Sequence, residues 1–299
     1  FYAARRDGAK GFPRFTDPRI RSATDYGSYL NMATEKALER LQTDHFDLLM
    51  LHNPDLIGYG SDRVWNELAR LKETQLTNQL GVAPGPANGF TLDLILCLER
   101  FGPLIDWAMI ILNPFEPWPG SLVLPAATAH NVKVISRVVD FGGIFNDDVR
   151  PGHVFGPADH RTFRPNGWIE TAIPKLDLLR PIAERHGLTP LQLACTWCWQ
   201  QSPVQSVVPT LIQEVGDGTK PIETKLRELA SVPSVILTDE ELDLIERVGD
   251  NRGCMQLKGA SLRHNADPLP DQWSVSAELA SVAQRWNIDP DRDLAYTHA

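Results

Sequence analysis

The residue with the clearest chemical potential is His52, which closes the apolar run DLLMLH from Asp47 to His52. A histidine at the end of a buried strand can donate a hydrogen bond to a carbonyl oxygen and help to place a proton on the developing alkoxide. This chemistry suits the interconversion of a carbonyl and an alcohol. A lone histidine after an apolar run is also common as a satisfied structural residue, so its place in the fold decides between the two interpretations.

A second group of candidate residues follows later apolar runs. Arg137 ends the run VKVISR, while Gln213 and Glu214 lie in PTLIQEVGDGTKP. The guanidinium of Arg137 could stack on a cofactor ring, pair with a phosphate or hold a substrate carboxylate. The Glu214 carboxylate would repel a ribose 2'-phosphate and could accept hydrogen bonds from an unphosphorylated ribose. The alternative for Glu214 is a solvated loop acid.

The loop NDDVRPGHVFGPADHRTFRPNGW carries the mixed charges of His153, Asp159, His160, Arg161 and Arg164. This mixture suits a lid that closes over cofactor phosphates or over a polyhydroxylated substrate. The loop shows no firm spacing of metal ligands. We therefore expect no metal ion.

The four cysteines do not indicate a redox or zinc site. Cys195 and Cys198 form a C-x-x-C within an apolar helical run, while Cys97 and Cys254 stand alone. A structural zinc site normally needs four ligands, and a reactive cysteine pair needs an exposed helix N-terminus. We expect reduced thiols in the core.

Alternating helices and strands must position these residues. The predicted strands are Asp47 to His52, Leu80 to Ala83, Met109 to Leu112, Val132 to Ser136 and Ser206 to Val208. Amphipathic helical segments such as Tyr29 to Leu41 lie between apolar runs of this kind. The alternation implies parallel strands with right-handed crossovers, and continuous runs such as LLML and MIIL imply burial on both faces. We expect one curved parallel sheet.

The alternation fits either a closed barrel or an open doubly wound sheet. About five strands are visible, fewer than the roughly eight of a closed barrel. However, no strand-to-helix junction carries the G-x-G-x-x-G turn that marks many doubly wound sheets. We therefore predict an α/β fold, a (β/α)8 TIM barrel whose N-terminal βα units are absent from this sequence.

Composition narrows the class of protein. The chain has 299 residues, of which 42% are hydrophobic and 22% charged, and its formal net charge is -9. The negative balance argues against nucleic-acid or membrane-surface partners. No run approaches the roughly 18 to 20 apolar residues of a membrane helix, and no signal segment opens the chain. We expect a soluble, cytoplasmic protein that acts on a small molecule.

The stretch ALERLQTDHFDLLMLHNPD resembles the aldo-keto reductase segment in which a helix and the fourth barrel strand lead to a catalytic histidine, here His52. The later runs LGVAPG, IILNPF, VISRVVDFGG, LTPLQLACTW and SVVPTLI resemble the family in the same order, so the similarity reaches about Gly253. The resemblance implies an NAD(P)-dependent oxidoreductase acting on a carbonyl or alcohol of a small molecule or sugar. The residues expected to contact the cofactor are Asn113, Arg137, Gln213 and Glu214, and those expected to contact substrate are Asn53, Tyr59 and Trp118.

The chain also departs from the family's pattern. The family's catalytic aspartate, tyrosine and lysine would lie upstream of Phe1. Glu214 stands where relatives usually offer positive charge, which favours NAD, whereas Lys220 and Lys225 leave NADP open. Relatives hold the nicotinamide carboxamide through hydrogen-bonding side chains. At these positions this chain has Ala83, Pro84 and Met109, whose side chains cannot form such hydrogen bonds.

Two other functions fit the same residues. One is a lyase or isomerase of this ancestry with His52 as acid and base, and the other is a non-catalytic scaffold subunit. We predict a barrel over residues 1–259 and an extension over 260–299. The short helix AELASVAQRW in this extension should dock through Leu279, Val282 and Ala283, as a lid or as a subunit contact. Homo-oligomer formation is left open.

Overall fold

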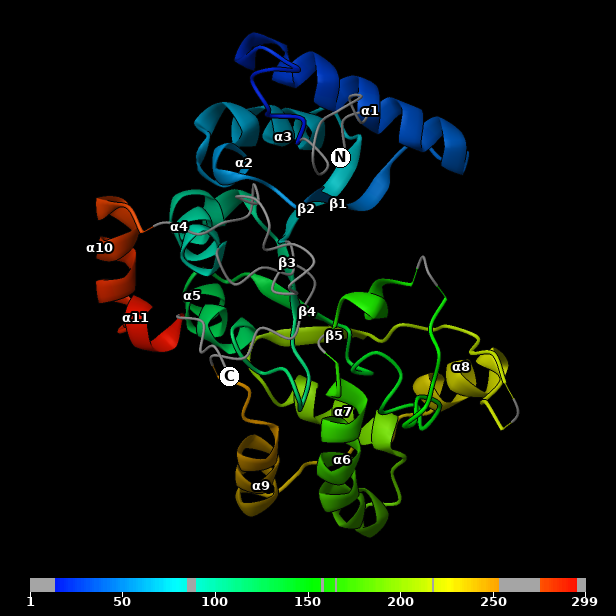
Figure 1. The fold of residues 1–299 in the computed structure, drawn as a ribbon. Coiled ribbons are helices and arrows are strands. Elements are labelled where there is room, and N and C mark those ends of the chain that lie inside the picture. Colours follow the sequence, from blue (N-terminus) through cyan, green and yellow to red (C-terminus); the bar gives the residue numbers. More distant parts are fainter. Residues whose placement is uncertain are drawn as a thin grey trace. The chain divides into compact units, whose positions relative to one another are not determined.

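The computed structural model describes residues 14–84, 90–156, 159–164, 166–216, 218–252 and 275–294. The chain divides into two compact units (Figure 1). Unit 1 comprises Phe1–Met109, Pro125–Lys133 and Asp267–Pro290, and unit 2 comprises Ile110–Leu124, Val134–Ala266 and Asp291–Ala299.

Helices and strands alternate as the sequence predicts. The strands are β1 (Phe46–His52), β2 (Thr77–Ala83), β3 (Trp107–Ile111), β4 (Lys133–Arg137) and β5 (Val204–Val208). The α-helices are α1 (Tyr26–Leu41), α2 (Leu56–Gly60), α3 (Asp62–Glu73), α4 (Thr91–Phe101), α5 (Leu124–Ala129), α6 (Trp168–Arg185), α7 (Pro190–Trp199), α8 (Ile222–Ala230), α9 (Asp239–Gly249), α10 (Ala277–Arg285) and α11 (Pro290–Asp293). The 3-10 helices are η1 (Ala23–Asp25), η3 (Gly102–Leu104), η4 (Gly120–Val123) and η5 (His160–Phe163). Each predicted strand is therefore present, with bounds shifted by a few residues.

Strand pairing in unit 1 is parallel. β1 pairs with β2 from Phe46 opposite Thr77 to His52 opposite Ala83, and β2 pairs in parallel with β3. Gly81 permits the close approach of β2 and β3, because a Cβ atom there would lie 2.9 Å from the carbonyl oxygen of Trp107. The carboxyl ends of β1 and β2 thus lie at the same edge.

Helices α1 and α3 lie beside β1 and β2 in Figure 1. Ser61 caps α3 by accepting a hydrogen bond from the backbone N–H of Val64. Val64, Leu68 and Leu71 lie on one helical face and are buried, as their spacing predicts. Burial of this apolar face holds α3 against the rest of unit 1.

The helix predicted near the C-terminus is α10, and it packs on α4 within unit 1. Leu279, Val282 and Ala283 are buried, which confirms the predicted docking face. Glu99 of α4 accepts hydrogen bonds from Arg285 and from the Trp286 indole. Whether this helix also serves as a lid or as a subunit contact stays a prediction.

In unit 2, β4 pairs in parallel with β5. Helix α7 begins with Thr189 as N-cap and Pro190 in the first turn. Gln192 completes a capping box, since its Oε1 accepts a hydrogen bond from the backbone N–H of Thr189. The buried face of α7 then packs against β5 and α6.

Candidate functional site

His52 is the last residue of β1, and its side chain is exposed. It lies opposite Ala83, the last residue of β2. The predicted position at the carboxyl end of a parallel strand is therefore correct, and active-site groups of βα barrels lie at such ends. The catalytic role of His52 stays a prediction.

Asn53 turns the chain away from the strand end. Its φ angle of 47° lies in the left-handed region, which asparagine tolerates better than most residues. Its N–H donates to the carbonyl oxygen of Ala83 at 2.8 Å, and its own carbonyl oxygen accepts from Arg14 Nε at 2.6 Å. The backbone of Asn53 thus fixes the exit from β1, while a substrate contact by its side chain stays a prediction.

Tyr59 does not lie in an open loop, as the substrate prediction requires. Asp55 caps α2 through a hydrogen bond from the Gly58 N–H, and the short helix turns Tyr59 inward. Tyr59 is 1% exposed, and its ring centre lies 5.3 Å from that of Phe90, so the ring packs inside unit 1. The predicted substrate contact is corrected to a packing role in unit 1.

Trp118 is buried in unit 2, where Ile111 and Leu122 pack against it. Its indole N–H donates to the carbonyl oxygen of Asp293 at 2.5 Å. The Asn251 side chain bonds both backbone groups of Trp118. Trp118 therefore packs within unit 2, and a substrate contact by this residue stays a prediction.

Asn113, predicted to contact the cofactor, has its amide engaged within its own loop. Its Oδ1 accepts from the N–H groups of Phe115 and Glu116, and its Nδ2 donates to Glu116 Oε2 and to the carbonyl oxygen of Val138. These four bonds use the whole capacity of an amide side chain. The structure therefore gives Asn113 a structural role, and a cofactor contact would require it to exchange partners.

Arg137 ends β4, where its carbonyl oxygen accepts a hydrogen bond from Leu112 N–H at 3.5 Å. It lies opposite Val208, the last residue of β5. Its place at the carboxyl ends of neighbouring parallel strands is the one predicted. Its role toward a cofactor stays a prediction.

Gln213 organises the segment before α8. Its Oε1 accepts from the N–H of Ile222 at 2.9 Å, and its Nε2 donates to the carbonyl oxygen of Glu214 at 3.3 Å. The side chain satisfies one of the N–H groups that begin α8. As with Asn113, its present partners are internal.

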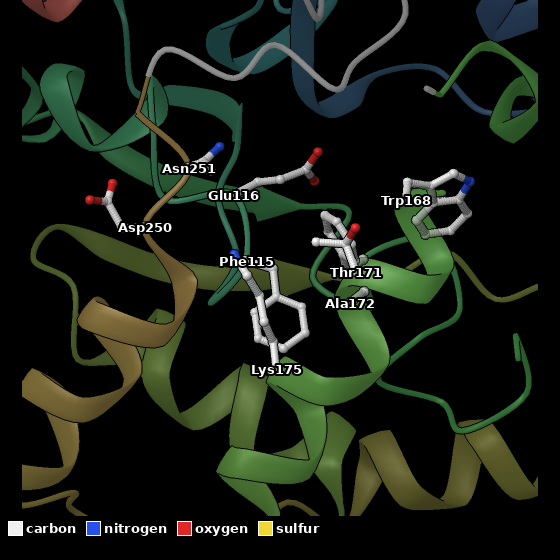
Figure 2. A pocket seen from close by; sticks show the side chains of 9 residues that line it. Phe115, Glu116, Trp168, Thr171, Ala172, Lys175, Asp250 and Asn251 are labelled. Carbon is white, nitrogen blue, oxygen red and sulfur yellow. The ribbon is translucent and has the colours of Figure 1, made fainter. Parts of the chain in front are cut away.

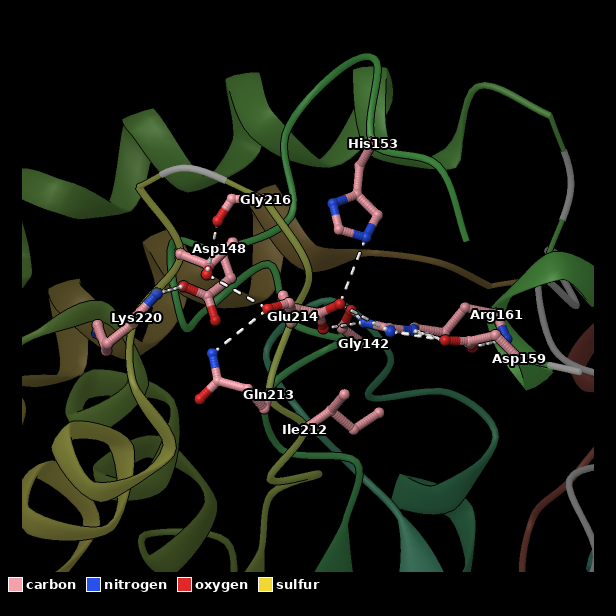
Figure 3. A network of polar contacts seen from close by, with 12 residues as sticks. Gly142, Asp148, His153, Asp159, Arg161, Ile212, Gln213, Glu214, Gly216 and Lys220 are labelled. Carbon is pink, nitrogen blue, oxygen red and sulfur yellow. Dashed lines mark hydrogen bonds and ion pairs between the residues drawn. The ribbon is translucent and has the colours of Figure 1, made fainter. Parts of the chain in front are cut away.

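Glu214 lies in a buried ion-pair cluster (Figure 3). Arg161 donates to both carboxylate oxygens, at 2.5 Å and 3.1 Å, and His153 Nε2 lies 3.3 Å from Oε2. Arg161 also binds Asp159. The alternative of a solvated loop acid is wrong, because the side chain is 5% exposed and a guanidinium from another loop compensates its charge.

A second buried pair joins the loop after β4 to helix α8. Lys225 is 1% exposed, forms an ion pair with Asp148 and donates to the carbonyl oxygen of Ile212 at 2.5 Å. Lys220 bonds Glu228 at 2.7 Å. The two lysines that left NADP open are thus already paired with carboxylates.

Asp140 is a structural residue that the sequence analysis missed. It is 1% exposed and accepts hydrogen bonds from the N–H groups of Gly143 at 2.7 Å and Thr210 at 2.6 Å. Burial raises the pKa of this carboxyl. Asp140 joins the loop after β4 to the loop after β5. The only local signal was an aspartate shortly before a glycine turn.

The cysteines of the described residues are free and buried. Burial raises the pKa of Cys195 and raises that of Cys198 to about 12, which suppresses the reactive thiolate. The expectation of reduced core thiols is confirmed for Cys97, Cys195 and Cys198, whereas Cys254 lies outside the described residues.

Two kinds of feature are absent from the described part of the chain. None of its helices is both long and apolar enough to cross a bilayer. Within the same residues, no group of three or more His, Cys, Asp and Glu side chains could hold a metal ion.

The chain is similar in sequence to a curated relative over most of its length. A probable voltage-gated potassium channel subunit beta from Arabidopsis thaliana is 24% identical over 233 residues, which are 72% of this chain and 65% of that protein. The chain thus spans just under two thirds of that relative's length.

Solved structures agree on the fold. The glycerol dehydrogenase of Gluconobacter oxydans superposes with a TM-score of 0.62 at 19% identity, covering 92% of this chain and 73% of that one. An aldo/keto reductase from Klebsiella pneumoniae, in complex with NADP and acetate, gives a TM-score of 0.52 at 18% identity over 73% of this chain and 64% of that one. The profile of the Aldo/keto reductase family matches residues 17–245. With its parallel α/β architecture, the chain therefore belongs to the aldo/keto reductase family, whose fold is a (β/α)8 barrel.

Proposed function

We propose that the protein is an NAD(P)-dependent oxidoreductase that interconverts a carbonyl and an alcohol on a small molecule or sugar. The observation that carries the proposal is the exposed imidazole of His52 at the carboxyl end of β1. There it can donate a hydrogen bond to the substrate oxygen and stabilise the charge that develops on it. Asn53 would help to orient the same substrate.

A bound nicotinamide cofactor would supply or accept the hydride. Arg137, at the carboxyl end of β4, is the residue that would hold the anionic part of such a group. The N–H groups of Arg161 are already bound to Asp159, to Glu214 and to the carbonyl oxygen of Gly142, so Arg161 would have to exchange partners to contact a phosphate. The loop carrying His153 and Arg161 remains our candidate for the lid.

The earlier preference for NAD depended on a repulsive carboxylate at Glu214. Its ion pair with Arg161 removes much of that repulsion, so the charge argument no longer separates the two cofactors. The reductase from Klebsiella pneumoniae that superposes on this chain holds NADP. We therefore propose NAD or NADP without a preference.

A second candidate is a non-catalytic scaffold subunit. It draws support from the similarity to a probable potassium channel subunit beta and from the internal engagement of Asn113 and Gln213. A lyase or isomerase step with His52 as acid and base is a third candidate. Ala83, Pro84 and Met109, which offer no side-chain amide or hydroxyl, are consistent with both.

Titration of the full-length protein with NADPH and NADH, followed by nicotinamide fluorescence, tests the proposal first. Turnover of a panel of aldehydes, ketones and sugars then tests the chemistry. We expect binding of at least one dinucleotide and turnover that depends on it. Binding without turnover of any carbonyl would favour the scaffold, and turnover of a substrate without dinucleotide would favour the lyase or isomerase.

We propose the division into a barrel over residues 1–259 and an extension over 260–299, a cytoplasmic location and a small-molecule substrate as the principal partner. Homo-oligomer formation would be read directly from the mass of the full-length protein in solution.

A further inference from the structure

The chain passes from His52 to the short helix α2 through a turn with an unusual backbone. Asn53 has a φ angle of 47°, in the left-handed region. It also precedes Pro54, whose ring favours extended backbone at the residue before it. Such a conformation persists only where the surrounding structure fixes it. The turn from His52 to Asp55 therefore needs support from other segments.

The segment ahead of α1 supplies this support. Arg14 Nε donates a hydrogen bond to the carbonyl oxygen of Asn53 at 2.6 Å, and Thr16 Oγ1 donates to Asp55 Oδ2 at 2.7 Å. The N–H of Asn53 donates to the carbonyl oxygen of Ala83, at the end of β2, at 2.8 Å. Both ends of the turn are thus tied to distant parts of unit 1.

The supporting segment is itself buried and anchored. Thr16 is 1% exposed, and its carbonyl oxygen accepts a hydrogen bond from the Tyr26 hydroxyl on α1 at 3.1 Å. The ring of Phe15 lies 5.5 Å from that of Tyr26, edge to face, and 5.6 Å from that of Tyr29. Because these groups are closely packed, a shift of Thr16 would also disturb α1. Thr16 therefore gives the turn a rigid point of attachment.

Asp55 uses both of its carboxylate oxygens in this arrangement. Oδ1 caps α2 by accepting from the N–H of Gly58 at 2.8 Å, while Oδ2 accepts from Thr16. The Trp65 indole N–H donates to the carbonyl oxygen of Gly58 at 3.1 Å, which holds the far end of α2. Loss of the Thr16 hydroxyl would leave one carboxylate oxygen without its donor and one end of the turn without its attachment.

The polar groups that line a hollow in unit 2 (Figure 2) have a different role. The Asn251 side chain bonds both backbone groups of Trp118, and the Glu116 carboxylate pairs with Arg164 at 3.0 Å. These contacts hold unit 2 together. The network around Asp55, by contrast, leads to residues that we propose to contact substrate.

We infer that Thr16 and Asp55 are positioning residues for His52 in the proposed reaction. They set the direction in which the chain leaves β1, and so the place of the imidazole and of Asn53 relative to a bound substrate. The expected effect on rate rests on the proposed function. The place of the His52 ring can be observed without any reaction.

The test compares Thr16→Val with wild type in the full-length protein, because valine removes the hydroxyl at nearly constant volume. Proton–carbon NMR of the histidine rings, with His52→Gln to identify the signal, should show that the His52 signal shifts or broadens. We expect kcat to fall about tenfold while KM stays within about twofold. Rates are expressed per folded protein, measured by circular dichroism, so a loss of stability does not enter them. Thr16→Ser keeps the hydroxyl and should restore the signal and most of kcat.

Thr34→Val is the matched control. Thr34 is a fully buried threonine of α1 whose hydroxyl has no hydrogen-bond partner among the described residues. Its replacement should leave the His52 signal and kcat unchanged. An unchanged His52 signal in Thr16→Val would overturn the inference, as would an equal shift in Thr34→Val. A signal that shifts only in Thr16→Val, in a protein that turns over no carbonyl, would support the positioning role and overturn the proposed function.

Discussion

A polar side chain is exposed at the carboxyl end of β1, whereas several in the segments after β4 and β5 are buried and ion-paired. His52 ends its strand with an exposed ring. After β5, Glu214 in the loop and Lys225 on α8 are buried, and each meets an opposite charge from the loop after β4. The comparison shows that the position of an exposed group at a strand end can be predicted from the sequence. The environment of a buried charge becomes clear only from its partner.

Of the variants considered, removal of Lys225 should give the largest loss in the free energy of unfolding. Lys225→Met leaves the Asp148 carboxylate buried without its cation, which should lower the free energy of unfolding by about 3 to 5 kcal/mol. Urea denaturation measures the loss. Lys36→Met, on the exposed face of α1, should change the same quantity by about 0.5 kcal/mol or less. Similar values for the two variants would show that the cluster is not a buried pair.

His52 should show the reverse behaviour, with a large effect on rate and a small one on stability. If the imidazole acts as proposed, His52→Gln should lower kcat/KM about a hundredfold, which corresponds to about 3 kcal/mol of transition-state stabilisation. Because the side chain is exposed, the free energy of unfolding should change by about 0.5 kcal/mol or less. Steady-state kinetics and urea denaturation of the same preparation provide both values. Unchanged kinetics would remove His52 from the mechanism.

The strands could be predicted because apolar runs such as LLML have one stable place in an α/β fold. Their bounds could not. β2 begins at Thr77, ahead of the predicted Leu80, because its polar first residues still pair with β1 through their backbone. A side-chain pattern carries no information about such pairing.

The position of His52 was predictable, while the environments of Glu214 and Tyr59 were not. Glu214 meets Arg161 across 53 residues of sequence, so no local pattern announces the pair. Tyr59 stands in a segment that reads as a loop, yet the Asp55 cap makes it helical and directs the ring inward. The environment of Asn113 was easier to predict. Its side chain accepts a hydrogen bond from the N–H of Phe115, two residues on, and asparagine is known to form turns in this way.

Asp93 on α4 sharpens the comparison because it is buried, like Asp148, but pairs with no cation among the residues that the structure describes. It is 7% exposed, and its Oδ2 has no hydrogen-bond partner among the described residues. Burial raises its pKa from 3.8 to about 7, and the Glu278 carboxylate on α10 adds to the shift. Cys97, on the same helix, is the other titratable group nearby.

The raised pKa means that the folded protein holds this proton more tightly than the unfolded chain does. Its stabilising contribution should be complete below pH 3.8 and lost as the pH rises to about 7. The full shift would be worth about 4 kcal/mol, and we expect about 2 kcal/mol because local opening admits water. Urea denaturation of wild type and Asp93→Asn from pH 4 to 8 measures it. Parallel pH profiles for the two proteins would contradict the assignment.

The smallest effect is expected for Glu214→Gln, measured as a change in the ratio of NADP to NAD affinity. The size of this change distinguishes a paired carboxylate from a free one. An uncompensated carboxylate beside a 2'-phosphate should shift the ratio of NADP to NAD affinity by about 1 to 3 kcal/mol, or roughly five- to a hundredfold. Arg161 already compensates Glu214, so Glu214→Gln should change this ratio by less than about fivefold. Fluorescence titrations of both dinucleotides against wild type and variant give the ratio directly. Arg161→Gln is the complementary variant: it frees the carboxylate and should weaken NADP more than NAD. A large gain in NADP affinity on Glu214→Gln would instead mean that the ion pair opens when cofactor binds, and that Glu214 behaves as the repulsive residue its sequence position suggested.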